Sequence, residues 1–200
     1  MPGRAATAAI LLGGDSKRMG RDKATLNWEG HSLLEHVHRQ VAPLVAEVLL
    51  VTRPDRIGTT RALAPPDARV IADTVDARGP LAGIHAALRA ATHASVLVLA
   101  CDMPRVSPTL LAGLLDDPRG DVVILRPGTF FEPLPAVYRR SCLPAIEAVL
   151  EQGSARVPAF FSAVQLSVWD DARLRSLDPD LASLANWNRP EDIPGTETSG

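Results

Sequence analysis

The sequence predicts a three-layer α/β fold, with a mainly parallel sheet and helices on both of its faces. Short apolar runs alternate along the chain with longer stretches of helical period, which is typical of parallel strands joined by crossover helices. The 200 residues are 46% hydrophobic, and no Pro- or Ser-rich linker divides them. We therefore expect a single domain over residues 1–193 and a disordered polar tail over residues 194–200.

Ten segments are expected to form the regular structure. The predicted strands are short apolar runs bordered by turn residues: Ala8–Leu12, Val48–Thr52, Val70–Ala72, Ser95–Ala100, Val122–Leu125 and Val164–Val168. The predicted helices are amphipathic stretches: Ser32–Leu44, Pro80–Ala91, Ser107–Leu115 and Cys142–Glu151. Ser107 and Pro108 are residue types typical of an N-cap and of the first helical position.

Composition and charge exclude several classes of function. The formal net charge is −2, and outside one loop the basic residues are spread along the chain, so there is no electrostatic footprint for nucleic acid. No apolar run approaches the roughly 20 residues of a membrane span, and the N-terminus lacks the apolar core of a signal peptide. Neither Cys101 and Cys142 nor the histidines have the spacing of a disulfide framework or a zinc site. We expect a cytoplasmic protein.

A loop rich in glycine and basic residues follows the first predicted strand. It reads LLGGDSKRMGRDK from Leu11 to Lys23. Glycines let backbone N–H groups approach anionic oxygens, and the lysines and arginines supply positive charge. The loop is not a Walker A motif, because five residues separate Gly14 from Gly20 and Arg21 follows, and it contains no G-x-G-x-x-G fingerprint. The composition predicts a polyphosphate-binding loop.

Three polar side chains of this loop are candidates for phosphate contact. Arg18 has a planar donor fork suited to bridging phosphate oxygens, whereas Lys23 offers a compact charge for the phosphoryl group under attack. Ser16 is a candidate donor to a phosphate oxygen, with a local backbone hydrogen bond as the alternative. Asp22 is interpreted as orienting Lys23 or the loop.

Two predicted strands end in a carboxylate. Asp102 follows the run SVLVLAC, and Asp73 follows the run VIA. Ligands of open α/β sheets bind at the carboxyl edge of the strands, and Mg²⁺ prefers carboxylate and phosphate oxygens. Asp102 is therefore the first candidate for a metal ligand, against the alternative of a helix cap or loop carboxylate. After Asp73, the stretch Gly-Pro-Leu-Ala-Gly from Gly79 has the composition of a helix start that allows close approach.

The loop resembles the signature G-G-x-S-x-R-M-G-x-D-K of the MobA-like nucleotidyltransferases. The matching residues are Gly13, Gly14, Ser16, Arg18, Met19, Gly20, Asp22 and Lys23. The resemblance extends over about residues 8–193, through the C-D-x-P stretch at Asp102, the G-P-L-A-G stretch at Gly79 and a closing N-x-N-x-P-E-D stretch from Asn186. It implies a Rossmann-like fold of the nucleotide-diphospho-sugar transferase type.

The resemblance also implies a reaction. GMP would be transferred from GTP to the terminal phosphate of molybdenum-molybdopterin with Mg²⁺, or Mn²⁺ in its place, releasing pyrophosphate and forming the guanine dinucleotide cofactor. A transient contact with proteins that deliver molybdopterin or receive the cofactor is a further expectation. The Gly13-Gly14 pair favours guanine, because cytidylyl and sugar-phosphate relatives tend to carry Ala-Gly there. Leu12, in place of the usual alanine, and the charge of Asp15 depart from the family pattern.

The roles implied by the resemblance fall into three groups. The catalytic residues would be Lys23, Arg18 and Asp102, with Asp102 as the metal ligand. The nucleotide would contact Leu11, Leu12, Gly13, Gly14, Ser16, Arg18, Lys23, Asp73, Gly79 and Asp102, with Asp76 as an alternative to Asp73. The pterin-bearing acceptor would contact Asn186, Asn188 and Arg156. An equally favoured interpretation is that the two asparagines form Asx turns before a helix.

Three other functions stay open at this point. Two are enzymes of the same kind, a molybdopterin cytidylyltransferase and a sugar-1-phosphate nucleotidyltransferase. The third is a non-catalytic carrier that binds nucleotide or cofactor, which the joint presence of Lys23, Asp73 and Asp102 makes less favoured. Nucleotide preference in a pyrophosphate-release assay distinguishes these two enzymes from a guanylyltransferase. A carrier would bind GTP without turnover.

Overall fold

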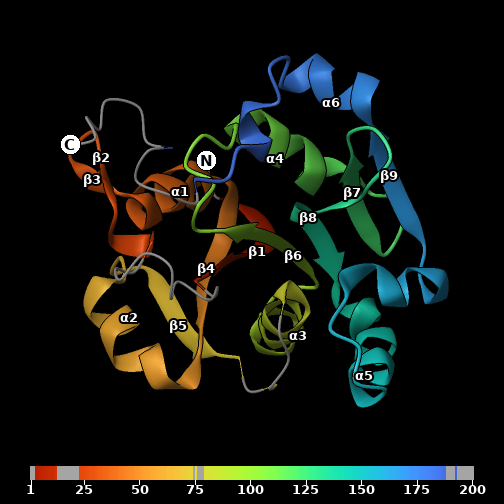
Figure 1. The fold of residues 1–200 in the computed structure, drawn as a ribbon, viewed down its shortest axis with the longest axis horizontal. Coiled ribbons are helices and arrows are strands. Elements are labelled where there is room, and N and C mark those ends of the chain that lie inside the picture. The colour runs from red at the N-terminus through yellow and green to blue at the C-terminus, as the bar shows by residue number, and fades with distance from the viewer. Residues whose placement is uncertain (1–2, 13–22, 74, 76–78, 188–191, 193–200) are drawn as a thin grey trace.

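A computed structural model describes residues 3–12, 23–73, 75, 79–187 and 192. Within them, a seven-stranded sheet has the order β5-β4-β1-β6-β8-β7-β9 (Figure 1). Its strands are β1 (Arg4–Leu11), β4 (Val45–Thr52), β5 (Ala68–Ala72), β6 (Ser95–Ala100), β7 (Val122–Arg126), β8 (Glu132–Arg139) and β9 (Leu166–Asp170). β8 is antiparallel to both of its neighbours, whereas the other pairs are parallel. A small hairpin joins β2 (Asn27–Trp28) to β3 (His31–Ser32).

Helices cover both faces of the sheet, as Figure 1 shows. They are α1 (Leu33–Val41), α2 (Ile57–Leu63), α3 (Pro80–Ala90), α4 (Pro108–Asp116), α5 (Leu143–Glu151) and α6 (Asp171–Leu177). Apolar residues of α1, α4 and α6 share one core layer with alternate residues of the strands, and those of α3 and α5 share the other. In β1, for example, Ala8 and Ile10 belong to the first layer, and Ala9 and Leu11 belong to the second. The fold is the three-layer arrangement that the sequence predicts.

Local sequence explains where the predicted helices begin. Ser32 and Glu35 form a capping box at α1, in which the Ser32 hydroxyl accepts from the Glu35 N–H at 3.2 Å and the Glu35 carboxylate accepts from the Ser32 N–H at 2.7 Å. Ser107 caps α4 with Pro108 at the first position, as predicted. The helix expected over Ser32–Leu44 ends at Val41, and a 3₁₀ turn follows it over Ala42–Leu44. None of the described helices has the length and hydropathy of a membrane span.

The structure departs from the predicted elements most clearly at β8. Its first residues, Glu-Pro-Leu-Pro, do not resemble a strand, because proline cannot donate to a β-ladder. The ladder with β6 accordingly covers only the later part of β8, from Ala136 to Arg139. The short α2 and α6 and the β2-β3 hairpin are further elements that the prediction lacks, and β9 begins at Leu166, two residues later than predicted.

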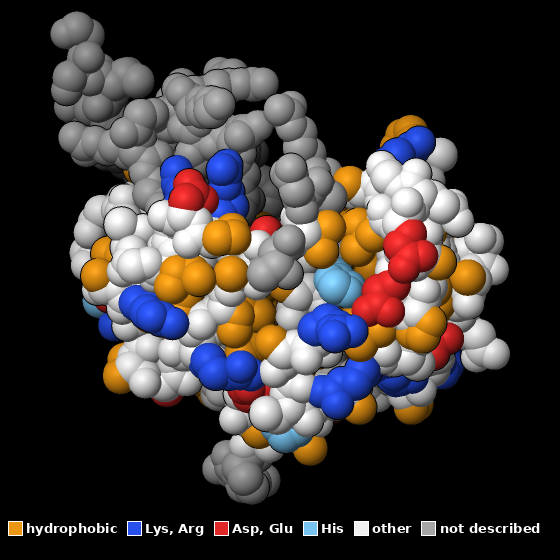
Figure 2. All heavy atoms as spheres, turned by 90° about the horizontal axis from the view of Figure 1, so that it is seen from below, with side chains coloured by type: hydrophobic (Ala, Val, Ile, Leu, Met, Phe, Trp, Pro, Cys, Tyr) orange, Lys and Arg blue, Asp and Glu red, His pale blue; other side chains and the backbone are white. Residues whose placement is uncertain are grey.

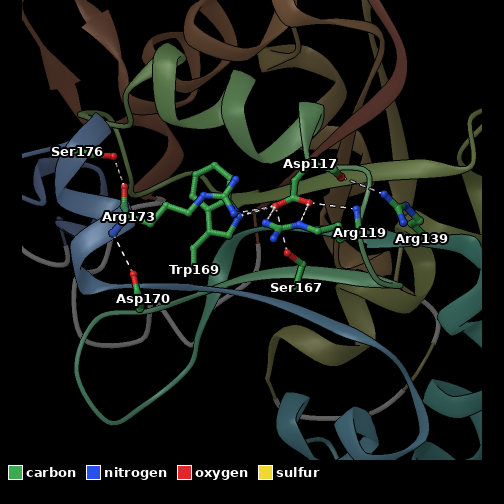
Figure 3. Close-up of polar contacts among 8 residues, drawn as sticks. All are labelled: Asp117, Arg119, Arg139, Ser167, Trp169, Asp170, Arg173 and Ser176. Atoms are coloured by element: carbon green, nitrogen blue, oxygen red, sulfur yellow. Dashed lines mark hydrogen bonds and ion pairs between the residues drawn. The ribbon is translucent and has the colours of Figure 1, made fainter.

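A charged cluster fastens β9 and α6 to the loop after α4 (Figure 3). Asp117 is only 4% exposed, and its carboxylate accepts from Arg119 at 2.6 Å, from the Trp169 indole at 2.8 Å and from the Ser167 hydroxyl at 3.1 Å. Arg173 completes the cluster, since its guanidinium lies 3.1 Å from the same carboxylate and 3.8 Å from the centre of the Trp169 ring. These hydrogen bonds hold the pKa of Asp117 far below its usual range. The cluster therefore links α4, β9 and α6 to one another.

Candidate functional site

Four neighbouring strands end side by side at the carboxyl edge of the sheet. The chain segments that follow them are tied together by backbone hydrogen bonds, from Asp73 N–H to the Thr52 carbonyl (2.8 Å), from Leu12 N–H to the Val51 carbonyl (2.8 Å) and from Cys101 N–H to the Leu11 carbonyl (3.1 Å). The segments after β5, β1 and β6 therefore meet at one edge. This edge contains Asp73, Leu11, Leu12 and Asp102, as the sequence predicts for a ligand site.

Asp102 lies in the turn that directly follows β6. Its neighbours Cys101 and Met103 are buried, which fixes the turn, while Asp102 itself is only partly buried. Its backbone carbonyl accepts a hydrogen bond from the N–H of Trp187 at 2.8 Å. The candidate metal ligand and the C-terminal segment that contains Asn186 are thus in direct contact, although neither the strand pattern nor the spacing of the two segments predicts it.

Trp187 anchors that C-terminal segment. Its side chain is 5% exposed and packs with Leu33 of α1. The ring also meets Trp28 of the β2-β3 hairpin edge-on, with 4.8 Å between ring centroids, and the Trp28 carbonyl lies 2.7 Å from Nε2 of His36. The hairpin and the start of α1 therefore hold Asn186 beside the turn of Asp102.

The two glycines of the G-P-L-A-G stretch lie where a side chain would not fit, each for a different reason. Gly79 precedes α3 with φ of +119°, a backbone conformation that favours glycine, and a Cβ there would lie 3.3 Å from the Ala155 carbonyl oxygen. Gly83, on the first turns of α3, lies against Leu11, whose Cδ2 would be 3.0 Å from an added Cβ. The stretch brings α3 tightly onto the end of β1 and places residues 155–156 beside the start of the helix.

Asp73 and Arg156 are the charged groups on the two sides of this helix start. Burial raises the pKa of the half-buried Asp73 carboxyl, and the nearby charge of Arg53 partly opposes that rise. Arg156 is exposed and occupies the N-cap position of the 3₁₀ segment Val157–Ala163, and its guanidinium forms no hydrogen bond or ion pair with the residues that the structure describes. Asp73 is therefore a partly buried acceptor close to the start of α3, and Arg156 is an exposed cation close to it.

Several predicted site residues lie outside the described residues. They are Gly13, Gly14, Ser16, Arg18, Asp76 and Asn188. Lys23 begins the 3₁₀ turn Lys23–Thr25, directly before the hairpin that contacts Trp187. The roles expected of the phosphate loop thus stay predictions.

The carboxylate of Asp102 is an oxygen donor, which suits hard divalent cations such as Mg²⁺ and Mn²⁺ better than zinc. Within the described part of the chain, no three His, Cys, Asp or Glu side chains are grouped as metal ligands. A single carboxylate is what Mg²⁺ needs when substrate phosphates and water complete its octahedral shell, whereas structural zinc sites use four protein ligands. Asp102 is suited to a metal that arrives with a polyphosphate.

One further carboxylate at this edge is absent from the sequence-based prediction. Glu132 is the first residue of β8 and pairs with Leu125 near the end of β7. Its sequence context, between Phe131 and Pro133, indicates a loop, so the sequence contains no strand signal that would place it at the edge. Only the antiparallel return of β8 brings it there.

A separate groove of about 570 Å³ lies between β5, α3 and α5. Arginine and glutamate side chains gather near apolar atoms on this face (Figure 2). Among its lining residues, His85 and Arg89 both contact Glu147, at 3.2 Å and 3.1 Å. These groups pair with one another, which makes the groove less suited to a polyphosphate than the carboxyl edge.

Comparison with known proteins identifies the family. The family model described as MobA-like NTP transferase domain matches residues 8–165. The chain belongs to the MobA-like NTP transferase family. The matched range of this family contains the second half of β1, Asp73, α3, Asp102 and Arg156, and the Asn186 segment follows it. As a MobA-like NTP transferase, the chain is a nucleotidyltransferase.

Individual relatives cover nearly the whole chain of this MobA-like protein. A probable molybdenum cofactor guanylyltransferase of Pelotomaculum thermopropionicum is 35% identical over 189 residues, which are 94% of this chain and 90% of the relative. A molybdenum cofactor guanylyltransferase of Pseudomonas putida is 36% identical and covers 92% of this chain and 93% of its own. The crystal structure of the molybdopterin-guanine dinucleotide biosynthesis protein A from Archaeoglobus fulgidus superposes with a TM-score of 0.79 at 30% identity, covering 93% of this chain and 94% of that one.

Proposed function

We propose that this MobA-like NTP transferase transfers GMP from GTP to the terminal phosphate of molybdenum-molybdopterin. The products would be the guanine dinucleotide form of the cofactor and pyrophosphate. The similarity to guanylyltransferases over more than nine-tenths of the chain supports this choice. The observation that carries it is the contact between Trp187 and Asp102, because it brings the candidate acceptor segment to the candidate metal ligand.

The reaction needs positioning and charge neutralisation rather than a covalent nucleophile. An oxygen of the acceptor phosphate forms a bond to the α-phosphorus of GTP, while the bond from that phosphorus to the bridging oxygen of pyrophosphate breaks in line. Negative charge accumulates on the departing pyrophosphate. In this proposal, Arg18, Lys23 and the amides of the glycine loop stabilise that charge.

Asp102 would hold Mg²⁺ at the phosphates. When bound there, the ion supplies a positive charge that neutralises phosphate oxygens. Asp102 is suited to this role because it sits at the carboxyl edge on a turn fixed by two buried neighbours and by the Trp187 hydrogen bond.

The nucleotide and the acceptor would meet at the turn of Asp102. On the nucleotide side, the end of β1 and the start of α3 would flank GTP, and the half-buried Asp73 would accept a hydrogen bond from a hydroxyl or N–H group of the nucleotide. On the acceptor side, Arg156 would pair with the phosphate of molybdopterin, and the Asn186 amide would contact the pterin.

Calorimetry of GTP binding, with and without Mg²⁺, tests the site. The expected result is Mg²⁺-dependent binding to the wild type, with CTP weaker, and loss of the Mg²⁺ effect in Asp102→Asn. Stronger binding of CTP would favour the cytidylyltransferase, and GTP binding without molybdopterin-dependent pyrophosphate release would favour the carrier. The Glu151→Gln variant, which changes an exposed carboxylate at the end of α5, is the matched control.

A further inference from the structure

Two residues of opposite charge, Arg53 and Asp73, continue neighbouring strands at the carboxyl edge of the sheet. β4 and β5 pair in parallel, without a register shift, up to Thr52 and Ala72. The ladder goes on for one more residue, since the Asp73 N–H donates to the Thr52 carbonyl at 2.8 Å. Arg53 keeps an extended backbone, with φ of −68° and ψ of 151°. Arg53 and Asp73 are therefore the next two neighbours across the strands, about 4.8 Å apart in strand spacing.

The alternation of β4 and β5 places both side chains on the face of the sheet that α3 covers. Val51 of β4 belongs to the core layer shared with α3, and Ile71 of β5 packs against the same layer. Arg53 and Asp73 follow these residues by two positions, and side chains two apart on an extended segment share a face. The charge of Arg53 also lowers the pKa of the Asp73 carboxyl, which agrees with their closeness.

Both charged groups are available to a ligand. The carboxylate of the half-buried Asp73 forms no hydrogen bond or ion pair with any residue in the described part of the chain. The Nε of Arg53 lies 3.2 Å from the carboxylate of Asp55, and 54% of the Arg53 side chain and 63% of the Asp55 side chain are exposed. An ion pair as exposed as this one contributes little to stability. A ligand can therefore replace Asp55 as the partner of Arg53 without disturbing the fold.

The backbone of Arg53 is fixed on both sides. Before it, the hydroxyl of Thr60 in α2 donates to the hydroxyl of the buried Thr52 at 3.2 Å. After it, the Arg56 N–H donates to the Arg53 carbonyl at 3.0 Å, which closes a turn. The guanidinium therefore moves only through the torsions of its own side chain, and less order has to be gained when a ligand binds.

The order of the strands assigns Arg53 and Asp73 to the base of GTP and not to its phosphates. In the proposed function, the glycine loop after β1 and Asp102 after β6 hold the phosphates and Mg²⁺, and β1 and β6 are neighbours. β4 and β5 lie on the other side of β1, so Asp73 follows a strand that is three places, roughly 14 Å, from β6. A carboxylate beside a phosphate would also repel it. The nucleoside end of GTP is therefore the part that reaches this pair.

We infer that Arg53 and Asp73 together select guanine, with Arg53 donating to its O6 atom and Asp73 accepting from its N1–H and its amino group. This inference rests on the proposed function. Among the four bases, guanine alone presents one acceptor beside two adjacent donors, which is complementary to a guanidinium beside the two oxygens of a carboxylate. The middle position of the cytosine edge is an acceptor, so cytosine would turn an acceptor toward the carboxylate in either orientation.

Calorimetric titrations of Arg53→Gln with GTP and 6-thio-GTP, in the presence of Mg²⁺, test the inference. In 6-thio-GTP a weakly accepting sulfur replaces O6, the partner assigned to Arg53. The wild type should bind GTP roughly 10-fold or more tightly than 6-thio-GTP. Arg53→Gln should bind GTP roughly 10- to 100-fold more weakly than the wild type, and should bind the two nucleotides within about twofold of each other. The control Arg61→Gln, which changes an exposed arginine on α2, should match the wild type.

Inosine triphosphate tests the part of Asp73. It lacks the amino group of guanine and keeps O6 and N1–H. The wild type should bind it more weakly than GTP, and Asp73→Asn should reduce that difference, because an amide is a weaker acceptor than a carboxylate. Arg53→Gln should keep the difference, because O6 and the amino group are recognised by different residues. An undiminished difference in Asp73→Asn would overturn the assignment of Asp73.

A contact with phosphate predicts another pattern for Arg53. Arg53→Gln would then weaken GTP, 6-thio-GTP and CTP by one common factor and preserve the ratios between them. That result would overturn the inference, and so would unchanged GTP binding, or a lower Tm with the ratios preserved, which assigns Arg53 a structural role. A wild type that prefers GTP but forms no product from molybdopterin refutes the proposed function only, because the nucleotide ratios still test Arg53. A wild type that binds CTP more tightly than GTP, or binds neither, refutes both.

Discussion

The N–H of Trp187 donates a hydrogen bond to the carbonyl oxygen of Asp102, at 2.8 Å. The contact joins the segment after the last helix to the turn after β6, in the middle of the sheet. The Trp187 ring is held by Trp28 and Leu33, which follow the predicted phosphate loop in the chain. Three segments that are distant in sequence thus meet at one edge, and a change in any of them should affect the others.

Replacement of Trp187 should therefore affect both stability and acceptor binding. Trp187→Ala removes a buried ring and should lower the free energy of unfolding by about 3 kcal/mol. The KM for molybdopterin should rise more than the KM for GTP, because Asn186 loses its anchor. Urea unfolding and steady-state kinetics measure the two effects. Trp187→Phe, which keeps part of the aromatic packing, is the control, and an alanine variant as stable as the wild type would contradict the anchor.

Gly79 should not tolerate a side chain. Its backbone lies at φ +119° and ψ 176°, a region that is almost closed to other residues, so Gly79→Ala should destabilise the fold by roughly 1–3 kcal/mol. The displaced start of α3 should also weaken GTP binding in calorimetry. The matched change Gly58→Ala, in α2 with open space around it, should be neutral or stabilising by up to about 1 kcal/mol. Equal effects at the two positions would rule out this account of Gly79.

Asp117 should matter for stability and not for catalysis. Asp117→Asn weakens the buried hydrogen bonds from the Trp169 indole and the Ser167 hydroxyl and should cost roughly 1–3 kcal/mol of unfolding free energy. The kcat of the folded fraction should stay within about twofold of the wild type, since the cluster does not include the residues of the candidate site. A large loss of kcat in a fully folded variant would place the cluster in the site.

Protonation of Glu47 should contribute to the loss of unfolding free energy in acid. Partial burial opposes ionisation of Glu47, but hydrogen bonds from Thr7, Thr92 and Arg69 outweigh it and lower the pKa from 4.5 to about 2. Because the pKa of the folded state is the lower one, the stabilisation is present above pH 4.5 and is lost as the pH falls toward 2. The difference in unfolding free energy between the wild type and Glu47→Gln should therefore shrink over this range in denaturant titrations. A constant difference would contradict the assignment.

The sequence reveals those parts of the site that depend on local pattern. Asp102 and Asp73 each follow a short apolar run, and parallel strands bring such ends to one edge, so their placement follows from the pattern alone. The match of G-P-L-A-G to a helix start has the same local basis, and the structure adds that Gly83 makes room for Leu11.

Other parts depend on contacts that no local pattern contains. The first four residues of β8 include two prolines, although β8 is an internal strand, so Glu132 appears in the sequence as a loop residue. The approach of Ala155 to Gly79 depends on how the segment after α5 passes α3. The Trp187 contact likewise requires the tertiary packing of α1 and the hairpin.

Product formation from molybdenum-molybdopterin is the most direct test of the central claim. Purified enzyme would be incubated with Mg²⁺, the acceptor and GTP, CTP or UTP, and the dinucleotide and pyrophosphate would be measured for the wild type, Asp102→Asn and the Glu151→Gln control. The account predicts guanine dinucleotide and pyrophosphate in equal amounts from GTP, with kcat reduced roughly 10²- to 10³-fold in Asp102→Asn and unchanged in the control. Faster turnover of CTP or UTP, or full activity of Asp102→Asn, would contradict it.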